Sequence, residues 1–197
     1  MMEGSSTRDM ARDLKAAIDA LGIGQAHVMG ISQGGMIAQY LAIDYPELID
    51  RLVIGISIAR PNATVQEVIG RWLALAESND YAALFIDAVE KTYPEIKARK
   101  YRPLYPVLTS IGKPRNLAAF AIQARACLGH DAYEELHRIK NPTLVIGDDS
   151  DLVVGKYTSE ELAQRIPHSE LYTTKGFGHG AFGEKEFNQQ VLRFLKA

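Results

Sequence analysis

The amino-acid sequence predicts an α/β fold built around a parallel β-sheet. Residues 26–31, 52–58 and 143–147 are short apolar runs without alternation, which is typical of strands covered on both faces. A fourth strand is expected near residues 170–173, and segments of helical composition separate the four runs. Strands that alternate with helices form β-α-β units, whose strands lie parallel in one sheet.

The helices beside these strands are predicted from apolar spacing and from end signals. Apolar residues at helical intervals predict a helix over residues 7–21, and Ser6 and Asp9 stand at capping-box distance at its start. Further helices are expected over residues 36–44, 159–166 and 184–195. About four strands and their helices are therefore recognisable.

The pattern of residues changes between Arg60 and His137. Aromatic and aliphatic residues recur there at helical spacings, no run resembles a strand, and prolines divide the segment into short pieces. The predicted organisation is therefore an α/β core formed by residues 1–59 and 139–197, interrupted by a helical insertion over residues 60–138.

Composition excludes several classes of protein. The chain has 197 residues, 47% of them apolar, which suits one domain with a small insertion. Its net charge is −2 without a long Lys/Arg cluster, so no nucleic-acid partner is expected. No stretch approaches 18 apolar residues and Cys127 has no internal disulfide partner, so we expect a cytoplasmic protein with no membrane partner. No set of His, Asp and Glu has metal-ligand spacing, so no metal site is expected.

Residues 30–34 match the pattern Gly-x-Ser-x-Gly, between the first strand and the next helix. A sharp turn there would strain Ser32 and lift its hydroxyl above the carboxyl end of the strand. Glycine is expected at both Gly30 and Gly34 to avoid collisions where strand and helix pass closely. The backbone N–H of Gln33 would face an oxyanion at the helix N-terminus. The pentapeptide alone fits equally well a glycine-rich turn with a capping serine.

A nucleophilic serine needs a histidine base and an orienting carboxylate, and both follow later strands. Asp148, Asp149 and Asp151 lie after the third strand, and His179 lies after the fourth. Both loops leave the carboxyl ends of parallel strands, where open α/β sheets place their ligands. The chain order Ser, Asp, His is the order of the elbow architecture. The loop offers more than one candidate for the acid.

Together these motifs resemble the α/β-hydrolase superfamily, in particular its small esterases and enol-lactonase-like members with a helical cap. The resemblance rests on residues 27–51, 141–147, 165–171 and 178–179, while the cap matches only in texture. It implies Ser32 as nucleophile, His179 as general base and Asp151 as orienting acid, with Asp149 as the alternative acid because family loops vary in length. It further implies hydrolysis of a small carboxylic ester or lactone through an acyl-enzyme, without a cofactor.

The family usually has four strands before the helix at residues 7–21, and this sequence has no residues for them. The chain is therefore expected to be a truncated or mis-started form, with strand 26–31 at an exposed sheet edge that a second copy could cover. The loop that supplies a second oxyanion N–H would be missing too, and one such donor is worth about 10²–10³ in rate. A catalytically impaired or non-catalytic protein that binds or dimerises is the alternative function.

Overall fold

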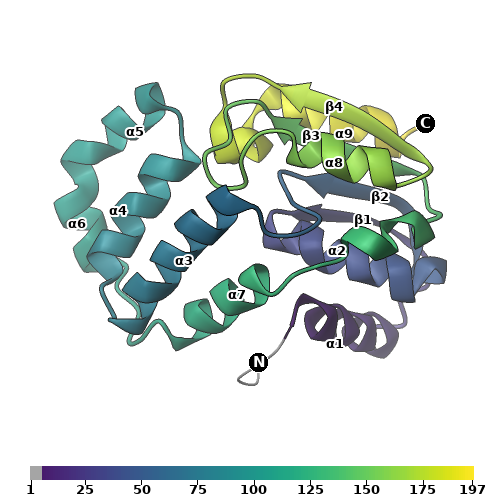
Figure 1. Ribbon diagram of the computed structural model, residues 1–197, viewed down its shortest axis with the longest axis horizontal. Coiled ribbons are helices and arrows are strands. Elements are labelled where there is room, and N and C mark those ends of the chain that lie inside the picture. The colour runs from purple at the N-terminus through teal and green to yellow at the C-terminus, as the bar shows by residue number, and fades with distance from the viewer. Residues whose placement is uncertain (1–5) are drawn as a thin grey trace.

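The computed structural model describes residues 6–197 and contains a four-stranded parallel sheet with helices on both faces (Figure 1). The strands β1 (Ala26–Ile31), β2 (Ile49–Gly55), β3 (Thr143–Asp148) and β4 (Ser169–Thr174) lie side by side in chain order. All neighbouring pairs are parallel, so the predicted fold class is confirmed. β2 lies three residues before its predicted range, because Ile56 adopts a positive φ of 41° and ends the strand.

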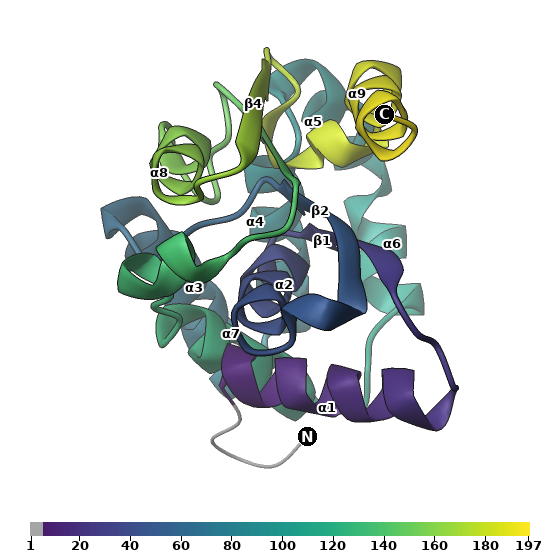
Figure 2. The same ribbon diagram turned by 90° about the vertical axis from the view of Figure 1, so that its right-hand side faces the viewer.

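Two apolar layers cover the sheet. Side chains alternate along β2, so that Leu52 and Ile54 join the cluster on one face while Val53 joins the cluster on the other. The first face packs against α1 (Thr7–Ala20), α2 (Gln33–Asp44) and α8 (Thr158–Arg165), with α1 lying on α2. The second face packs against α9 (Lys185–Leu195) through Phe187 and Val191. Figure 2 shows α8 and α9 on opposite sides of β4.

The helices between β2 and β3 lie together at one end of the molecule (Figure 1). They are α3 (Ala63–Glu77), α4 (Tyr81–Thr92), α5 (Glu95–Tyr101), α6 (Tyr105–Ile111) and α7 (Ala118–Leu128). Their buried cluster, which includes Trp72 and Leu84, also takes in Met36 of α2 and Val153 of the loop after β3. The helical end of the molecule is therefore seated on the carboxyl edge of the sheet, above α2 and this loop.

Short 3-10 helices complete the chain, at Pro46–Leu48, Arg102–Leu104, Tyr133–Arg138 and Gly178–Gly183. Leu136 in the third of these is fully buried in the cluster that includes residues of α2 and α8. The chain has therefore returned to the sheet core before residue 138.

β1 forms one edge of the sheet, since within residues 6–197 it pairs only with β2. Its Met29 is 43% exposed, whereas Val53, the residue of β2 that pairs with it, is fully buried.

α1 is amphipathic, and its start has the predicted capping box, in which the Asp9 N–H donates to the Ser6 hydroxyl. In the part of the chain that the structure describes, no helix combines the length and apolar character needed to cross a bilayer.

Candidate active site

Ser32 stands on a strained turn between β1 and α2. Its φ of 53° and ψ of −118° form a conformation that residues other than glycine rarely adopt. The turn is held through the Ser32 carbonyl, which accepts hydrogen bonds from the N–H groups of Gly35 and Met36 and from the Ser57 hydroxyl at 2.8 Å. Strain at Ser32 is thus supported by three donors, which leave its side chain free to point out of the turn.

Two glycines, Gly30 and Gly35, permit this turn. The motif predicted the need for Gly30 but not for Gly35. A Cβ on Gly30 would lie 2.3 Å from the carbonyl oxygen of Gly34, so any side chain there would displace the backbone. A Cβ on Gly34 would meet nothing within 4 Å, and the predicted steric need at that position is wrong. The need falls on Gly35, where a Cβ would lie 2.7 Å from the side chain of Ser57. The helical rotation of α2 turns position 35, rather than 34, toward the residues after β2.

Ser32, His179 and Asp151 form one hydrogen-bonded row. The Ser32 Oγ lies 2.9 Å from His179 Nε2, and His179 Nδ1 lies 2.8 Å from Asp151 Oδ2. The other carboxylate oxygen of Asp151 accepts from the N–H groups of Val153 and Val154 at 2.8 and 3.0 Å. Asp151 and His179 are buried and Ser32 is partly exposed. An imidazole held in this way lies within reach of the serine proton.

The other two aspartates, Asp148 at the end of β3 and Asp149 directly after it, form no hydrogen bond with His179. Asp149 is exposed, and its carboxylate accepts from the N–H of Gly176 at 3.2 Å. Asp148 is buried, and its carboxylate binds the backbone of the histidine loop. It accepts hydrogen bonds from the N–H of Phe177 at 3.1 Å and from the N–H of Gly178 at 2.9 Å. Asp148 also accepts from Ser150 and Thr174.

Sequence reasoning missed this role of Asp148 as an anchor for the histidine loop. Burial raises the pKa of the Asp148 carboxyl, but the hydrogen bonds from Ser150, Thr174 and Phe177 outweigh it, so that the pKa lies below its ordinary value. Asp148 is therefore held as a carboxylate. The only signal in the sequence is its place as the last residue of an apolar strand, from which its partners thirty residues away cannot be read.

Gln33 follows the serine and links the turn to the helical end of the molecule. Its N–H belongs to the first turn of α2, where backbone donors have no acceptor within the helix and the helix dipole favours negative charge. Its side-chain amide donates to the carbonyl of Gln123 in α7 at 2.9 Å. Burial raises the pKa of the neighbouring Cys127 thiol to about 11, which suits the packed residue expected at that position.

Helix α4 closes the other side of the histidine loop. A Cβ on Gly180 would lie 2.8 Å from the Tyr93 ring, and one on Gly178, whose φ is 66°, would lie 3.0 Å from the Thr92 carbonyl oxygen. The end of α4 therefore packs directly on the backbone that holds His179.

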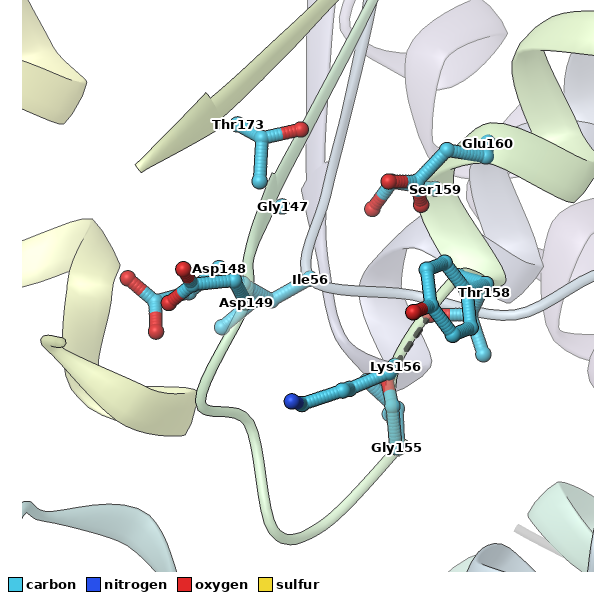
Figure 3. Close-up of a pocket in the computed structure, with 12 residues that line it drawn as sticks. Ile56, Gly147, Asp148, Asp149, Gly155, Lys156, Thr158, Ser159, Glu160 and Thr173 are labelled. Atoms are coloured by element: carbon cyan, nitrogen blue, oxygen red, sulfur yellow. Dashed lines mark hydrogen bonds between the residues drawn. The ribbon is translucent and has the colours of Figure 1, made fainter. Parts of the chain in front are cut away.

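A polar cavity of about 210 Å³ lies on the α8 side of the acid loop (Figure 3). Lys156 and the first residues of α8, Thr158 and Ser159, form part of its wall. In Figure 3 the side chains of Asp148 and Asp149 extend away from Ser159. Neither Ser32 nor His179 lines this cavity, so it is separate from the hydrogen-bonded row.

Fold and site together define the class of protein. The sequence profile described as the alpha/beta hydrolase fold matches residues 3–186, and the chain belongs to this family. RutD of Caulobacter sp. (strain K31), whose name assigns it provisionally to carbamate hydrolysis, is 30% identical in an alignment of 190 residues that covers 94% of this chain and 71% of that protein. The predicted resemblance is thereby confirmed.

Two solved structures have the same fold. MGS-M2, an alpha/beta hydrolase enzyme from a Medee basin deep-sea metagenome library, matches with a TM-score of 0.92 and 24% identity over 100% of this chain and 74% of its own. The enol-lactonase from Burkholderia xenovorans LB400 matches with a TM-score of 0.85 and 22% identity over 98% of this chain and 74% of its own. The protein is a hydrolase of the α/β family, for which a small molecule is the substrate.

Proposed function

We propose that the protein is a serine hydrolase that cleaves a small carboxylic ester or lactone through an acyl-enzyme. The observation that supports this most directly is the row from Ser32 through His179 to Asp151, with both heavy-atom distances below 3 Å. The lactonase among the proteins of the same fold agrees with the substrate class. No cofactor is needed, since the chemistry requires only these side chains and water.

The proposed reaction has two halves. His179 Nε2 takes the proton of the Ser32 hydroxyl while the oxygen attacks the carbonyl carbon, and the N–H of Gln33 donates to the oxyanion that forms. The imidazolium then returns its proton to the leaving alkoxide, which departs as an alcohol and leaves the acyl group on Ser32. Water gives a proton to His179 and attacks the acyl carbon, after which Ser32 regains its proton and the acid is released. Asp151 holds the imidazole in the tautomer that has its proton on Nδ1.

A fluorophosphonate probe tests the nucleophile directly. We expect the probe to label the wild-type protein and to leave Ser32→Ala unlabelled, while Ser110→Ala, which alters an exposed serine of α6, labels like the wild type. Turnover of short-chain esters and lactones should disappear with the same variant. Absence of labelling in a wild-type protein with a cooperative unfolding transition would instead favour the non-catalytic binding protein.

A further inference from the structure

The surface of α5 and α6 combines positive charge with exposed apolar side chains. Residues 96–115, here called the α5–α6 surface, contain six Lys and Arg residues and no Asp or Glu, in a chain whose net charge is −2. Sixteen of the 20 residues of this range are exposed, and its helices lie at the end of the molecule farthest from the sheet (Figure 1). The chain therefore concentrates cations on one protruding surface while the remainder is acidic.

An apolar stripe follows the exposed side of α6. Leu104, Val107, Leu108 and Ile111 recur at intervals of three and four residues, which places them on one face of a helix. Val107 is 53% exposed and Ile111 is 81% exposed. Tyr105, at the start of α6, is buried and packs edge-on against the ring of Phe85 in α4. Tyr105 therefore anchors α6 to the neighbouring helices, while the four residues of the stripe face solvent.

The cations around the stripe are largely free of internal partners. Two of the six form ion pairs, Arg102 with Glu90 and Glu95, and Lys97 with Glu184. The remaining four have no ion-pair partner within residues 6–197; these are Arg99, Lys100, Lys113 and Arg115. Arg102 pairs with two acids, Glu90 and Glu95, so its single charge cancels only one of their two charges. With Glu184 included, the six cations still outnumber the paired acids by three, and they share one stretch of chain with the exposed aliphatic side chains.

We propose that the α5–α6 surface binds the anionic face of a lipid bilayer, with the stripe inserted at the headgroup level and the cations on lipid phosphates and carboxylates. Apolar area and positive charge on one exposed helix are the two attractions that hold a peripheral helix at such an interface. An aqueous surface offers no gain for four exposed aliphatic side chains in one row. The proposal departs from the sequence-based expectation of no membrane partner, which rested on the lack of a long apolar segment and so did not consider a helix lying on a bilayer.

The same surface is connected to the candidate active site through short contacts. α5 begins two residues after Tyr93, whose ring packs on Gly180, and Lys97 pairs with Glu184 at the end of the histidine loop. Binding at the bilayer would therefore hold this side of the molecule near the lipid surface. The proposal concerns binding alone and stands whether or not the protein hydrolyses an ester.

Cosedimentation with sucrose-loaded vesicles tests the proposal. We expect the protein to bind phosphatidylcholine vesicles that contain about 30% phosphatidylserine and to bind pure phosphatidylcholine far more weakly, with the difference reduced at about 0.5 M salt. The stripe variant Val107→Asp/Ile111→Asp should weaken binding at least about tenfold, because it removes two inserted side chains. The charge variant Lys113→Glu/Arg115→Glu should weaken it by about twentyfold or more, at about fivefold for each cation removed.

The control changes exposed apolar residues elsewhere. Leu21→Asp, just after α1, and Leu192→Asp, on α9, alter side chains that are 74% and 54% exposed, and both variants should bind like the wild type. The proposal is overturned if the wild-type protein fails to bind the anionic vesicles, or if the stripe variant binds as well as the controls. It is also overturned if the stripe variant abolishes a concentration-dependent dimer seen by light scattering, since a second copy would then occupy the surface.

Discussion

Replacing Asp148, Asp149 and Asp151 in turn with asparagine should separate three roles that the sequence places within four residues. Asp148 accepts hydrogen bonds at both carboxylate oxygens, including two from the backbone of the histidine loop. Asp148→Asn turns one acceptor into a donor that faces N–H or O–H groups. Two bonds to a charged acceptor are then lost, and a hydroxyl such as that of Thr174 can reorient to recover part of the loss. We expect the free energy of unfolding to fall by about 3 kcal/mol.

The other two substitutions give contrasting results. Asp151→Asn keeps an oxygen for the N–H groups of Val153 and Val154 but no longer accepts from His179 Nδ1, so we expect a loss of about 10⁴ in kcat with about 1 kcal/mol of stability. Asp149→Asn changes an exposed residue with one hydrogen bond, and both quantities should stay near wild type.

Urea unfolding and ester hydrolysis on the three variants measure both quantities. Asp148→Asn should also lower kcat, because the loop that holds His179 loses its anchor at Gly178. The reasoning is refuted if Asp148→Asn is no less stable than Asp149→Asn, or if Asp149→Asn is the variant that loses activity.

Three more predictions concern the surroundings of the site. Gly35→Ala should lower the free energy of unfolding by about 1–3 kcal/mol, whereas Gly34→Ala should leave it unchanged or raise it by up to about 1 kcal/mol. Thermal melts would measure both variants, and equal effects would contradict the contact of position 35 with Ser57. Burial lowers the pKa of His130 to about 4, so the unfolded chain binds the proton more readily and stability falls as the pH drops from about 6.5 toward 4. At pH 5 the resulting loss in the free energy of unfolding is about 2 kcal/mol. Urea titrations should show that the stability of His130→Gln depends less on pH than that of the wild type. Gln33→Leu should lower the free energy of unfolding by about 1 kcal/mol and speed hydrogen exchange in α7. Unchanged exchange would show that the Gln33 side-chain amide does not link the serine turn to α7.

The sheet edge at β1 leads to a proposal about assembly. Backbone groups of an edge strand can pair with another chain, and the exposed Met29 of β1 is an apolar side chain that does not oppose such pairing. We propose that a second copy of the chain covers this edge. Light scattering on Met29→Lys beside the wild type would test it, because a charge at the edge should dissociate the oligomer, and a monomeric wild type would contradict it.

Much of the fold could be predicted because its signals are local. The apolar runs that became β1 and β3, the capping box at Ser6 and the proline at residue 46 each act over a few residues and appear where the pattern indicated. Only β3 is buried throughout, however, because β1 lies at the sheet edge. The shift of β2 has a different origin. The apolar run continues through Ile58, and the strand ends earlier because Ile56 turns the chain so that Ser57 can reach the Ser32 carbonyl.

The candidate site divides in the same way. The serine turn and the two loops at the carboxyl edge of the sheet were predicted from motif and chain order, and the structure brings Ser32 and His179, 147 residues apart, within hydrogen-bonding distance. Three neighbouring aspartates, however, have almost the same local sequence. Which of them meets the imidazole depends on how the loop folds back, and that is a property of contacts with β4 and the histidine loop.

The sequence by itself determined the parallel sheet, the strained serine between strand and helix, and the sheet edge where Ser32, Asp151 and His179 gather. Periodicity and turn chemistry act between near neighbours, and those features need nothing more. The tertiary structure alone decided that Asp151 faces His179, that Asp148 anchors the histidine loop, and that Gly35 rather than Gly34 lies against Ser57. These outcomes depend on atoms of distant segments meeting at close range, where a rotation by one residue moves a side chain from one neighbour to another.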